Sequence, residues 1–451
     1  MTVAESTPTR KSTRNILDSF FRKLVVNRLS STQGGQIELH DAGEKFVFGQ
    51  SSDLKTTLNI HRPRFFRQAV LGGSLSVAHA YIHGDWDCDD LTSFFRIFVR
   101  SHSKPSFLTR SVMNVTNFSH RIYHWLHDNT RTGSRQNISA HYDVGNDFYR
   151  LWLDPTLAYS SGIFPTPDAS MTEASKEKFD RVCRKIEVSD NDHLVEIGTG
   201  WGGFALHAVE NYQCKVTTTT ISSQQHEIAR ERIEASGKQD RIKLLQTDYR
   251  DLTGQFDKLV SIEMIEAVGY KHLDQYFSRC SQLLRPDGTM ILQAIVMPER
   301  GYRNYLNSVD FIQRYVFPGG CLPSVAAMLE SAGRATDLRF VHAEDFAPHY
   351  AETLRRWRTA FEQRLDAIRQ LGYSEKFIRL WRYYFCYCEA AFEERCVGVV
   401  QVQFDKPKCR RDPLNVSKHS AVPHRQTNHS MEKSSPAGLN SQLSQEFSTH
   451  A

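Results

Sequence analysis

The sequence predicts an α/β protein whose main sheet is parallel and covered by helices on both faces. From about residue 137 onward, short apolar or β-branched runs alternate with stretches of helical periodicity. The runs are HLVEIG, CKVTTTT, KLLQTD, KLVSIEM and TMILQAIV, and VGVVQVQF at 397–404 is expected to be the last strand. Strands that alternate with helices form parallel sheets, because each crossover helix packs back over the sheet. A glycine-rich turn directly after the first run favours the same class.

The composition is that of an ordinary globular protein. Of the 451 residues, 40% are hydrophobic and 24% are charged, which excludes a wholly disordered or fibrous chain. At roughly 150 residues per domain, the length suggests about three units, or two with a tail. No run approaches the roughly 18 to 20 consecutive apolar residues of a membrane-spanning helix, and the polar start is not expected to be a secretory signal. Nine cysteines without a short repeated spacing favour a reduced, cytoplasmic setting over a disulfide framework.

Changes in composition divide the chain into five segments. The alternating runs QIELHD and KFVFG predict a small mixed domain ahead of the parallel sheet, with a helix beginning at Asp89 or Asp90. The end of the chain is rich in Ser, Asn, Gln, His and Pro and poor in apolar residues, which is typical of disorder. The expected segments are a disordered start (1–12), a small amino-terminal domain (13–95), a basic bridging segment (96–136), the main α/β domain (137–407) and a disordered tail (408–451).

Basic residues gather in two places. Residues 96–136 carry seven basic residues and one acid, with aromatic residues among them. Residues 16–29, ILDSFFRKLVVNRL, combine apolar positions at helical spacing with Arg22, Lys23 and Arg28. This pattern predicts a basic amphipathic helix that either meets a membrane surface or packs on its own domain. Nucleic-acid binding is not expected, because no recognition motif accompanies the charge.

The sharpest motif is VEIGTGWGG at 195–203, where a strand runs into a glycine turn and then a helix. Glycines let the backbone turn tightly and approach a ligand, and the helix start offers free N–H groups. A dinucleotide site would need an acid after the second strand to hold the ribose, but TTISSQQ at 219–225 has none. The acid before the first glycine, Glu196, is typical of S-adenosylmethionine sites, and Trp201 is unusual in a phosphate cradle. A tight turn without a ligand is the alternative.

Polar residues also follow the other strands. The hydroxyl of Ser222 and the amides beside it can bond a ribose or an amino-acid group, or Ser222 can simply cap the next helix. Asp248 follows the third strand, where a carboxylate can accept from an adenine amino group or stand as a solvated loop acid. Glu266 follows a further strand, at the edge where ligands bind in parallel sheets. Its alternative role is that of a favourable partner for a helix dipole.

Seven motifs occur in a characteristic order: HYDVGNDFY, AYSS, VEIGTGWGGFA, TISSQQ, IEMIEAVG, FIQRYVFPGGCLPS and HYAETLRRW. Together they resemble the cyclopropane-fatty-acyl-phospholipid synthase family of S-adenosylmethionine-dependent enzymes. The resemblance runs from about Gly34 to Phe404. It includes GGSLSVAHAYIHGDWDCDDL, which is similar to the small lipid-engaging domain of the family. Several motifs in order are far more specific than any one of them alone.

The resemblance implies a Rossmann-like class I methyltransferase fold with a mostly parallel seven-stranded sheet and a helical insertion over the active site. A small mixed α/β lipid-engaging domain would precede it. The residues implied to hold S-adenosyl-L-methionine are Tyr159, Ser160, Glu196, Gly198, Gly200, Trp201, Gly202, Thr220, Ser222, Gln225, Asp248 and Tyr249. An acyl channel would be lined by Phe311, Tyr315, Phe317 and the helices between Tyr350 and Phe392. Core packing is the alternative for each of these aromatic residues.

The chemistry of the family needs a base. An alkene is a weak nucleophile that attacks an electrophilic methyl held in line, and the positive charge left on the chain can be stabilised by aromatic faces. In well-known synthases a bound hydrogencarbonate then removes a proton, held by a cysteine, a glutamate, a histidine and a tyrosine. The glutamate and the tyrosine match Glu266 and Tyr350 here, but the cysteine position is Ser161 and the histidine position is Gln293. These departures put cyclopropane closure in doubt and leave open whether hydrogencarbonate is the base.

Another family cysteine matches Cys388, which is marked in the family as an active-site residue. A small buried hydrophobe on a helix is the alternative for Cys388. The expected function is transfer of a methyl or methylene carbon to the cis double bond of an unsaturated phospholipid acyl chain, giving a cyclopropane, methyl-branched or methylene product. Small-molecule N-methylation and non-catalytic lipid binding are the alternatives. We expect no metal, peripheral contact with the inner face of the membrane through the basic amino-terminal region, and, from the family, a homodimer.

Overall fold

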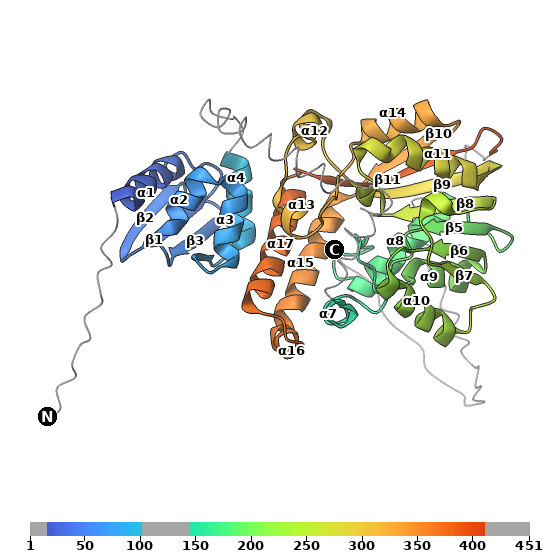
Figure 1. Ribbon diagram of the computed structural model, residues 1–451, viewed down its shortest axis with the longest axis horizontal. Coiled ribbons are helices and arrows are strands. Elements are labelled where there is room, and N and C mark those ends of the chain that lie inside the picture. Colours follow the sequence, from blue (N-terminus) through green and yellow to red (C-terminus); the bar gives the residue numbers. More distant parts are fainter. Residues whose placement is uncertain (1–15, 102–144, 411–451) are drawn as a thin grey trace, which may run out of the picture.

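The computed structural model describes residues 16–101 and 145–410, which form a small amino-terminal body and a larger α/β body (Figure 1). The basic segment beyond residue 101, the expected disordered start and nearly all of the expected tail lie outside the described residues. Residues 408–410 are the exception. The Lys408 amide donates to the Pro286 carbonyl at 3.0 Å, so the start of the expected tail is tied to the main body.

The amino-terminal body is a four-stranded sheet with four helices. Its strand order is β2-β1-β3-β4, and only β1 and β3 pair in parallel. The bounds are α1 (Ile16–Leu29), β1 (Gln36–Asp41), β2 (Glu44–Gly49), β3 (Lys55–Ile60), α2 (Arg64–Leu71), α3 (Gly73–Ile82), β4 (Trp86–Cys88) and α4 (Leu91–Ser101). The predicted strands QIELHD and KFVFG are therefore present. Trp86 is fully buried, with the rings of Phe65, Tyr81 and Phe94 centred 5.1–5.8 Å from it.

The predicted end of the small domain at residue 95 is wrong, because it falls inside α4. That helix continues to Ser101, since Phe94, Ile97 and Phe98 keep the spacing that packs one face on the domain core. Asp90 accepts from the Ser93 amide at 2.9 Å, which agrees with the predicted helix start. Arg96 of this helix pairs with Glu394 at 2.7 Å, so at least one basic residue of the predicted bridging segment holds the protein together.

Helix α1 forms as predicted, and its apolar residues serve two sides. Phe21, Val25, Val26 and Leu29 pack against the core of the small domain. Ile16, Leu17, Phe20 and Leu24 are 86%, 58%, 57% and 39% exposed. Packing on its own domain therefore accounts for only one of these two groups of apolar residues on α1. No described helix is both long and apolar enough to span a bilayer.

The larger body contains the predicted seven-stranded sheet, in the order β10-β11-β9-β8-β5-β6-β7. The strands are β5 (His193–Ile197), β6 (Lys215–Thr219), β7 (Ile242–Leu245), β8 (Phe256–Ile262), β9 (Leu284–Val296), β10 (Arg339–Asp345) and β11 (Gly398–Asp405). Strands β5 to β9 pair in parallel, and β11 runs antiparallel between β9 and β10. This is the mostly parallel, Rossmann-like arrangement that the sequence predicts.

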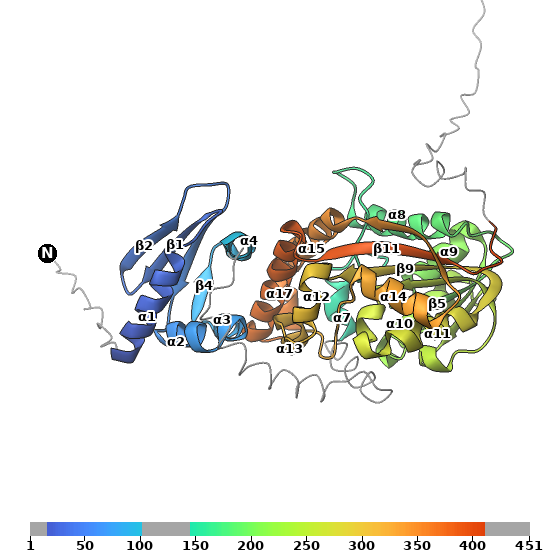
Figure 2. The ribbon, with the colours of Figure 1, turned by 90° about the horizontal axis from the view of Figure 1, so that it is seen from above.

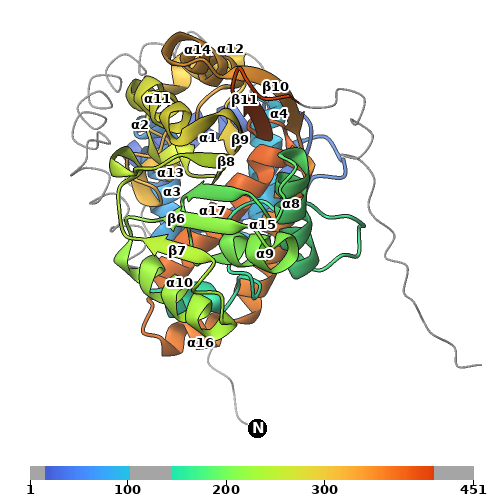
Figure 3. The same ribbon diagram turned by 90° about the vertical axis from the view of Figure 1, so that its right-hand side faces the viewer.

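Helices cover both faces of this sheet (Figures 2 and 3). Leu194 points to one face, where it meets α8 (Met171–Lys185) and α9 (Gly203–Tyr212). Its neighbour Val195 points to the other face, towards α11 (Leu273–Leu283) and α14 (Val325–Ala335). Alternate residues of one strand thus serve two cores, which explains why these strands are apolar throughout. Helix α10 (Ser223–Ser236) joins β6 to β7, and α7 (Asn146–Arg150) begins the body.

Two groups of helices are inserted near the end of the chain. Helices α12 (Glu299–Tyr305) and α13 (Phe311–Tyr315) follow β9, and α15 (Ala347–Gln363), α16 (Leu365–Gln370) and α17 (Glu375–Glu393) lie between β10 and β11. Helices α15 and α17 stand between the amino-terminal body and the sheet (Figure 1). The amino-terminal body contacts α17 through α3 and α4.

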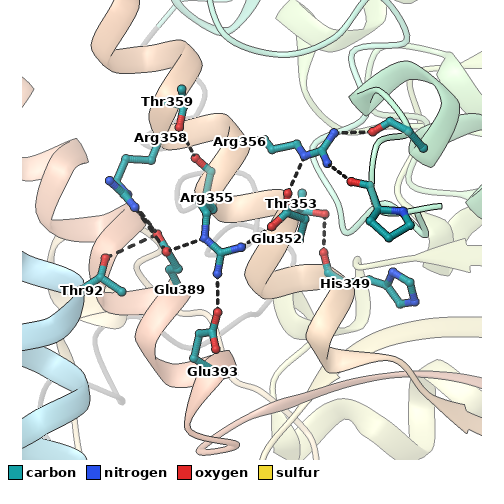
Figure 4. Close-up of polar contacts among 12 residues, drawn as sticks. Thr92, His349, Glu352, Thr353, Arg355, Arg356, Arg358, Thr359, Glu389 and Glu393 are labelled. Atoms are coloured by element: carbon teal, nitrogen blue, oxygen red, sulfur yellow. Dashed lines mark hydrogen bonds and ion pairs between the residues drawn. The ribbon is translucent and has the colours of Figure 1, made fainter. Parts of the chain in front are cut away.

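The contact between the two bodies combines rings and ion pairs on α17. Arg379 donates to the carbonyls of Tyr81 and Trp86 at 2.5 and 2.8 Å. Further along the helix lies Glu389, which is 3% exposed. Its carboxylate accepts from Arg358 at 3.0 Å and from Thr92 of α4 at 3.4 Å, and it pairs with Arg355 (Figure 4). A buried carboxylate therefore ties α4 to both α15 and α17.

Candidate functional site

The glycine turn lies at the carboxyl end of β5, as predicted. Gly198, Gly200 and Gly202 have φ values of 102°, 52° and 84°, a region that disfavours side chains. A Cβ atom built on Gly200 would meet nothing within 4 Å, whereas one on Gly203 would lie 2.6 Å from the Thr156 carbonyl oxygen. The turn is thus closed at the helix start and open at Gly200. The open side is where a ligand can approach the backbone.

Trp201 anchors this turn. Its indole N–H donates to the Asn146 side-chain oxygen at 2.8 Å, and its ring centre lies 5.0 Å from that of Tyr149. Its carbonyl accepts from Arg232 at 2.6 Å, and the same arginine donates to Thr156 at 3.0 Å. The HYDVGNDFY and VEIGTGWGG motifs therefore meet through a tryptophan and an arginine. The role of Trp201 in binding the cofactor is still a prediction, but these contacts show that Trp201 positions the turn.

Glu196 is buried beside the turn. Its carboxylate accepts from the Thr218 hydroxyl of β6 at 2.6 Å. Burial raises the pKa of Glu196 to about 8, against the opposing effects of that hydrogen bond and of Lys178. At neutral pH this favours a protonated acid that joins two strands below the open side of the turn.

The loops after β6 and β7 lie at the same edge of the sheet, because parallel neighbours end together. Thr220 donates to the Gln225 side chain at 2.9 Å, and Ser222 caps α10 by accepting from the Gln225 amide. The capping alternative for Ser222 is therefore confirmed. Asp248 is not a solvated loop acid, since it is buried and paired with Arg250 at 2.7 Å. The Tyr249 ring packs against Tyr276, with centres 5.5 Å apart.

The polar centre of the site is the carboxylate of Glu263, directly after β8. One oxygen, Oε1, accepts from the Ser161 amide at 2.9 Å and from the Gln293 side-chain amide at 2.8 Å. The other, Oε2, accepts from the Tyr350 hydroxyl at 2.8 Å. Three of the four positions that the resemblance assigns to an anion thus bind one side chain of the protein itself. Ser161 takes part through its backbone, because its hydroxyl donates to the Gly162 carbonyl.

Glu263 escaped prediction from the sequence, which pointed to Glu266 instead. The structure places Glu266 on the 3₁₀ turn at Ile265–Ala267, where its Oε1 accepts from the Ile295 amide at 2.6 Å. Its Oε2 has no hydrogen-bond partner among the described residues. Burial and the negative charge of Glu263 raise the pKa of Glu266 to about 8. The signal that could have found Glu263 is its position as the first acid after a buried strand. Its φ of 49° is uncommon for a glutamate and marks a constrained backbone.

The orientation of Gln293 follows from a row of hydrogen bonds behind it. Lys185 donates to the Gln401 side-chain oxygen at 2.7 Å, and the Gln401 amide nitrogen donates to the Gln293 oxygen at 3.0 Å. Gln293 must then present its own N–H to Glu263. Lys185 is held in turn by Glu344 at 2.5 Å. A lysine that can only donate therefore sets the direction of both amides.

Tyr159 and Ser160 lie beside this centre. The Ser160 hydroxyl accepts from Lys178 at 2.6 Å, and the Tyr159 hydroxyl donates to that of Tyr384 at 3.0 Å. Burial lowers the pKa of Lys178 to about 8, while Glu263, Asp154 and Glu196 oppose the shift. Lys178 was not predicted, since a lysine inside an amphipathic helix usually reaches solvent.

The predicted acyl-binding residues occupy two places. Phe317 lies by the site, with its ring centre 6.3 Å from those of Tyr159 and Tyr384. Phe311 is buried and packs on Tyr383 and on Tyr315, with ring centres 4.6 and 5.6 Å away. Core packing thus accounts for Phe311, while Phe317 borders the site. The predicted channel itself is still a prediction.

Cys388 lies on α17 and packs against the large core cluster as a partly buried side chain. Burial, with Asp310 and Cys386 nearby, raises the pKa of its thiol far above the usual value. A thiol that stays protonated is a poor nucleophile. Within residues 16–101 and 145–410, no cluster of His, Cys, Asp and Glu is suited to hold a metal ion.

Comparisons with known proteins agree with this geometry. Residues 129–402 match the family model described as mycolic acid cyclopropane synthetase. The chain is 36% identical over 372 residues to tuberculostearic acid methyltransferase UfaA1 of Mycobacterium tuberculosis, covering 78% of this chain and 84% of that protein. It is 32% identical over 358 residues to the cyclopropane-fatty-acyl-phospholipid synthase of Escherichia coli K12, covering 77% and 87%.

A solved structure gives the same result for the larger body. The crystal structure of mycolic acid cyclopropane synthase CmaA1 complexed with SAH and CTAB superposes with a TM-score of 0.57 at 30% identity. The match covers 60% of this chain and 98% of that one.

Proposed function

Because this chain belongs to the mycolic acid cyclopropane synthetase family and is an S-adenosylmethionine-dependent methyltransferase, we propose that its acceptor is an unsaturated acyl chain. The carbon would go to the cis double bond of a chain within a membrane phospholipid. The observation that carries this proposal is the setting of Glu263, a carboxylate held by three neutral hydrogen-bond donors near aromatic rings. Such a site suits an apolar acceptor that must lose a proton.

The residues around the glycine turn fit the cofactor. Gly200 faces open space that a Cβ would enter, and the loops after β5, β6 and β7 meet at one edge of the sheet. S-adenosylmethionine supplies an electrophilic methyl carbon there. We propose that the turn and Tyr159 to Ser160 hold it, with Thr220 to Gln225 and Asp248 to Tyr249 at the ribose and the adenine.

The cofactor assignment predicts the effect of Gly200→Val. A branched side chain at a φ of 52° would both strain the backbone and fill the open space. We expect at least a roughly 100-fold loss of cofactor affinity, or about 2.7 kcal/mol, in calorimetric titration. A variant of an exposed residue on the same helix, Glu210→Gln of α9, serves as the control for folding. Unchanged affinity would remove the turn from the site.

The acceptor is expected to reach the site from a membrane surface. The exposed Ile16, Leu17, Phe20 and Leu24 lie on a helix that also carries basic residues, a combination that favours the interface of an anionic bilayer. The rings of Tyr159, Phe317 and Tyr384 can stabilise positive charge on the chain. We therefore place the protein at the inner face of a membrane, as a peripheral enzyme.

The test is mass spectrometry of fatty acids after incubation with S-adenosylmethionine and vesicles of an unsaturated phosphatidylglycerol. A gain of one CH2 at the expense of the double bond is the expected result. Saturated vesicles should show no gain, which is the matched control. If the cofactor binds but no vesicle lipid gains mass, a small-molecule acceptor takes the place of the lipid, and assays with soluble amines follow.

A further inference from the structure

We infer that Glu263 is the catalytic base, a carboxylate built into the chain where related enzymes would bind a separate anion. This inference rests on the proposed function, because it concerns the proton that the acyl chain must lose. It makes the reaction independent of hydrogencarbonate. It also explains Ser161 and Gln293, the two departures from the family pattern, because both donate a hydrogen bond to Glu263.

The first support is the number of donors on the Glu263 carboxylate. An ionised carboxylate has about four acceptor positions on two oxygens. The Ser161 amide and the Gln293 side chain fill two on Oε1, and the Tyr350 hydroxyl fills one on Oε2. Among the residues that the structure describes, nothing fills the remaining lone pair of Oε2, which can take a proton. The same three donors cannot hold a second anion without releasing the first.

The second support is the fixed direction of the Gln293 amide. Lys185 and Gln401 leave Gln293 with its N–H towards Glu263, as the row of bonds at 2.7 and 3.0 Å requires. Tyr350 is equally fixed as a donor, because burial raises the pKa of its hydroxyl well above the usual value. Each of the three donors to Glu263 thus stabilises the ionised form, which is the form that a base needs.

The third support is the balance of charge around the carboxylate. Burial raises the pKa of Glu263, while Gln293, Lys178, the Ser161 amide and Tyr350 oppose the rise. Glu266, the other carboxyl nearby, has no such set of donors and a pKa of about 8. The larger set of donors therefore favours the negative charge of the pair on Glu263. A carboxylate whose proton affinity is raised is well matched to the task of a base.

The π electrons of the alkene form the new carbon–carbon bond as the carbon–sulfur bond breaks, which leaves a positive charge on the acyl chain. Oε2 of Glu263 takes a proton from the added methyl group. The electron pair of that C–H bond either closes a cyclopropane ring or, after a hydride shift along the chain, forms a methylene double bond. Glu263 then passes its proton to water, and S-adenosylhomocysteine departs.

The decisive variant is Glu263→Gln, which keeps the size of the side chain and removes the base. With wild-type enzyme active on vesicles, we expect turnover to fall about 100- to 10,000-fold and cofactor affinity to change less than about threefold. Glu263→Asp should recover part of the rate, because it restores a carboxylate. Glu38→Gln on β1 of the amino-terminal body is the matched control and should match the wild type, because Glu38 is partly exposed and far from the site in sequence and fold. Wild-type turnover in Glu263→Gln would overturn the inference.

Chemical rescue and gas exclusion give the second measurement. Glu263→Ala should regain activity with formate or hydrogencarbonate, whereas the wild type should gain nothing from either anion. Wild-type rate should also be unchanged in buffer freed of carbon dioxide. A wild type that loses activity there and regains it with hydrogencarbonate would overturn the inference, even though the proposed function would stand. A wild type inactive on every lipid would instead overturn the proposed function.

A readout without the cofactor is available in the infrared spectrum. The difference between wild type and Glu263→Gln isolates the ionised carboxylate of Glu263. Its midpoint should lie above the usual range of a glutamate and coincide with the acid limb of the rate profile. A purely structural role for Glu263 would give no such coincidence.

Discussion

Two glutamates, the partly buried Glu263 after β8 and the buried Glu389 on α17, are held in opposite ways. Glu389 is bound by the guanidinium groups of Arg355 and Arg358, which remain charged at any accessible pH. Glu263 is bound by an amide of the backbone, an amide of a side chain and a hydroxyl. Only Glu263 can take up a proton without leaving a cation unpaired. Neutral donors allow Glu263 to act as a base, whereas the fixed cations make Glu389 a structural link between helices.

The largest expected effect that separates the two is on stability. Glu389→Ala leaves two arginines without their shared partner, so we expect a loss of about 2 kcal/mol in unfolding free energy. This is below the roughly 3–5 kcal/mol of fully buried pairs, because both arginines are partly exposed. Urea unfolding monitored by circular dichroism measures it. Glu263→Gln should lose less than half as much unfolding free energy. Equal losses in the two variants would contradict the distinction between a structural Glu389 and a catalytic Glu263.

The next effect is on pH dependence. Tyr350→Phe removes one donor from the ionised carboxylate of Glu263, and removing that hydrogen bond raises its pKa. The acid limb of the rate profile should therefore move up by about one pH unit, since a hydrogen bond to a charged group is worth roughly 1.5–3 kcal/mol. Lys178 and Glu266 also face the carboxylate and are unchanged in this variant. An acid limb that does not move would show that Tyr350 has no effect on the group that titrates.

The smallest expected effect is that of Glu266→Gln. With a pKa of about 8, Glu266 is protonated at neutral pH, and glutamine resembles a protonated acid. The glutamine oxygen can still accept from the Ile295 amide. We expect turnover to fall less than about tenfold, in the same vesicle assay as Glu263→Gln. A larger loss than in Glu263→Gln would instead support the role that the family resemblance implies for Glu266, as one of the residues that hold the base.

The fold was largely predictable because its signals are local. Six of the seven strands of the large sheet correspond to short apolar or β-branched runs, and the motif at Gly198 to Gly202 places a strand, a turn and a helix in one stretch. The exposed strand β10 has no such run and was not predicted. The boundary at residue 95 failed because helical spacing through Ile97 continues past it. Helix α1 was predictable as a helix, but which of its apolar residues stay exposed depends on the sheet it packs against.

The site was predictable in part, since its groups come from distant segments. Ser161, Gln293 and Tyr350 could be identified by motif, and they do converge. The side chain that they bind could not, because Glu263 and Glu266 are three residues apart in one motif. Choosing between them requires the backbone turn at Glu263, which has a φ of 49°. Lys178 and Gln401 were missed for a similar reason, as their purpose appears only in tertiary contact.

Helix α17 carries one further consequence. Its Tyr383 packs against Tyr81 and Phe95 of the amino-terminal body, while the next residue, Tyr384, meets Tyr159 at the site. Helix α17 therefore contacts the amino-terminal body on one face and the candidate site on the other. The presence of the amino-terminal body restricts which residues the first face can carry. In a family member without the amino-terminal body, a residue at the position of Tyr383 would lose the packing of Tyr81 and Phe95, and Arg379 would lose the two carbonyls to which it donates. The residues at those two positions should therefore indicate whether an unfamiliar relative contains the amino-terminal body.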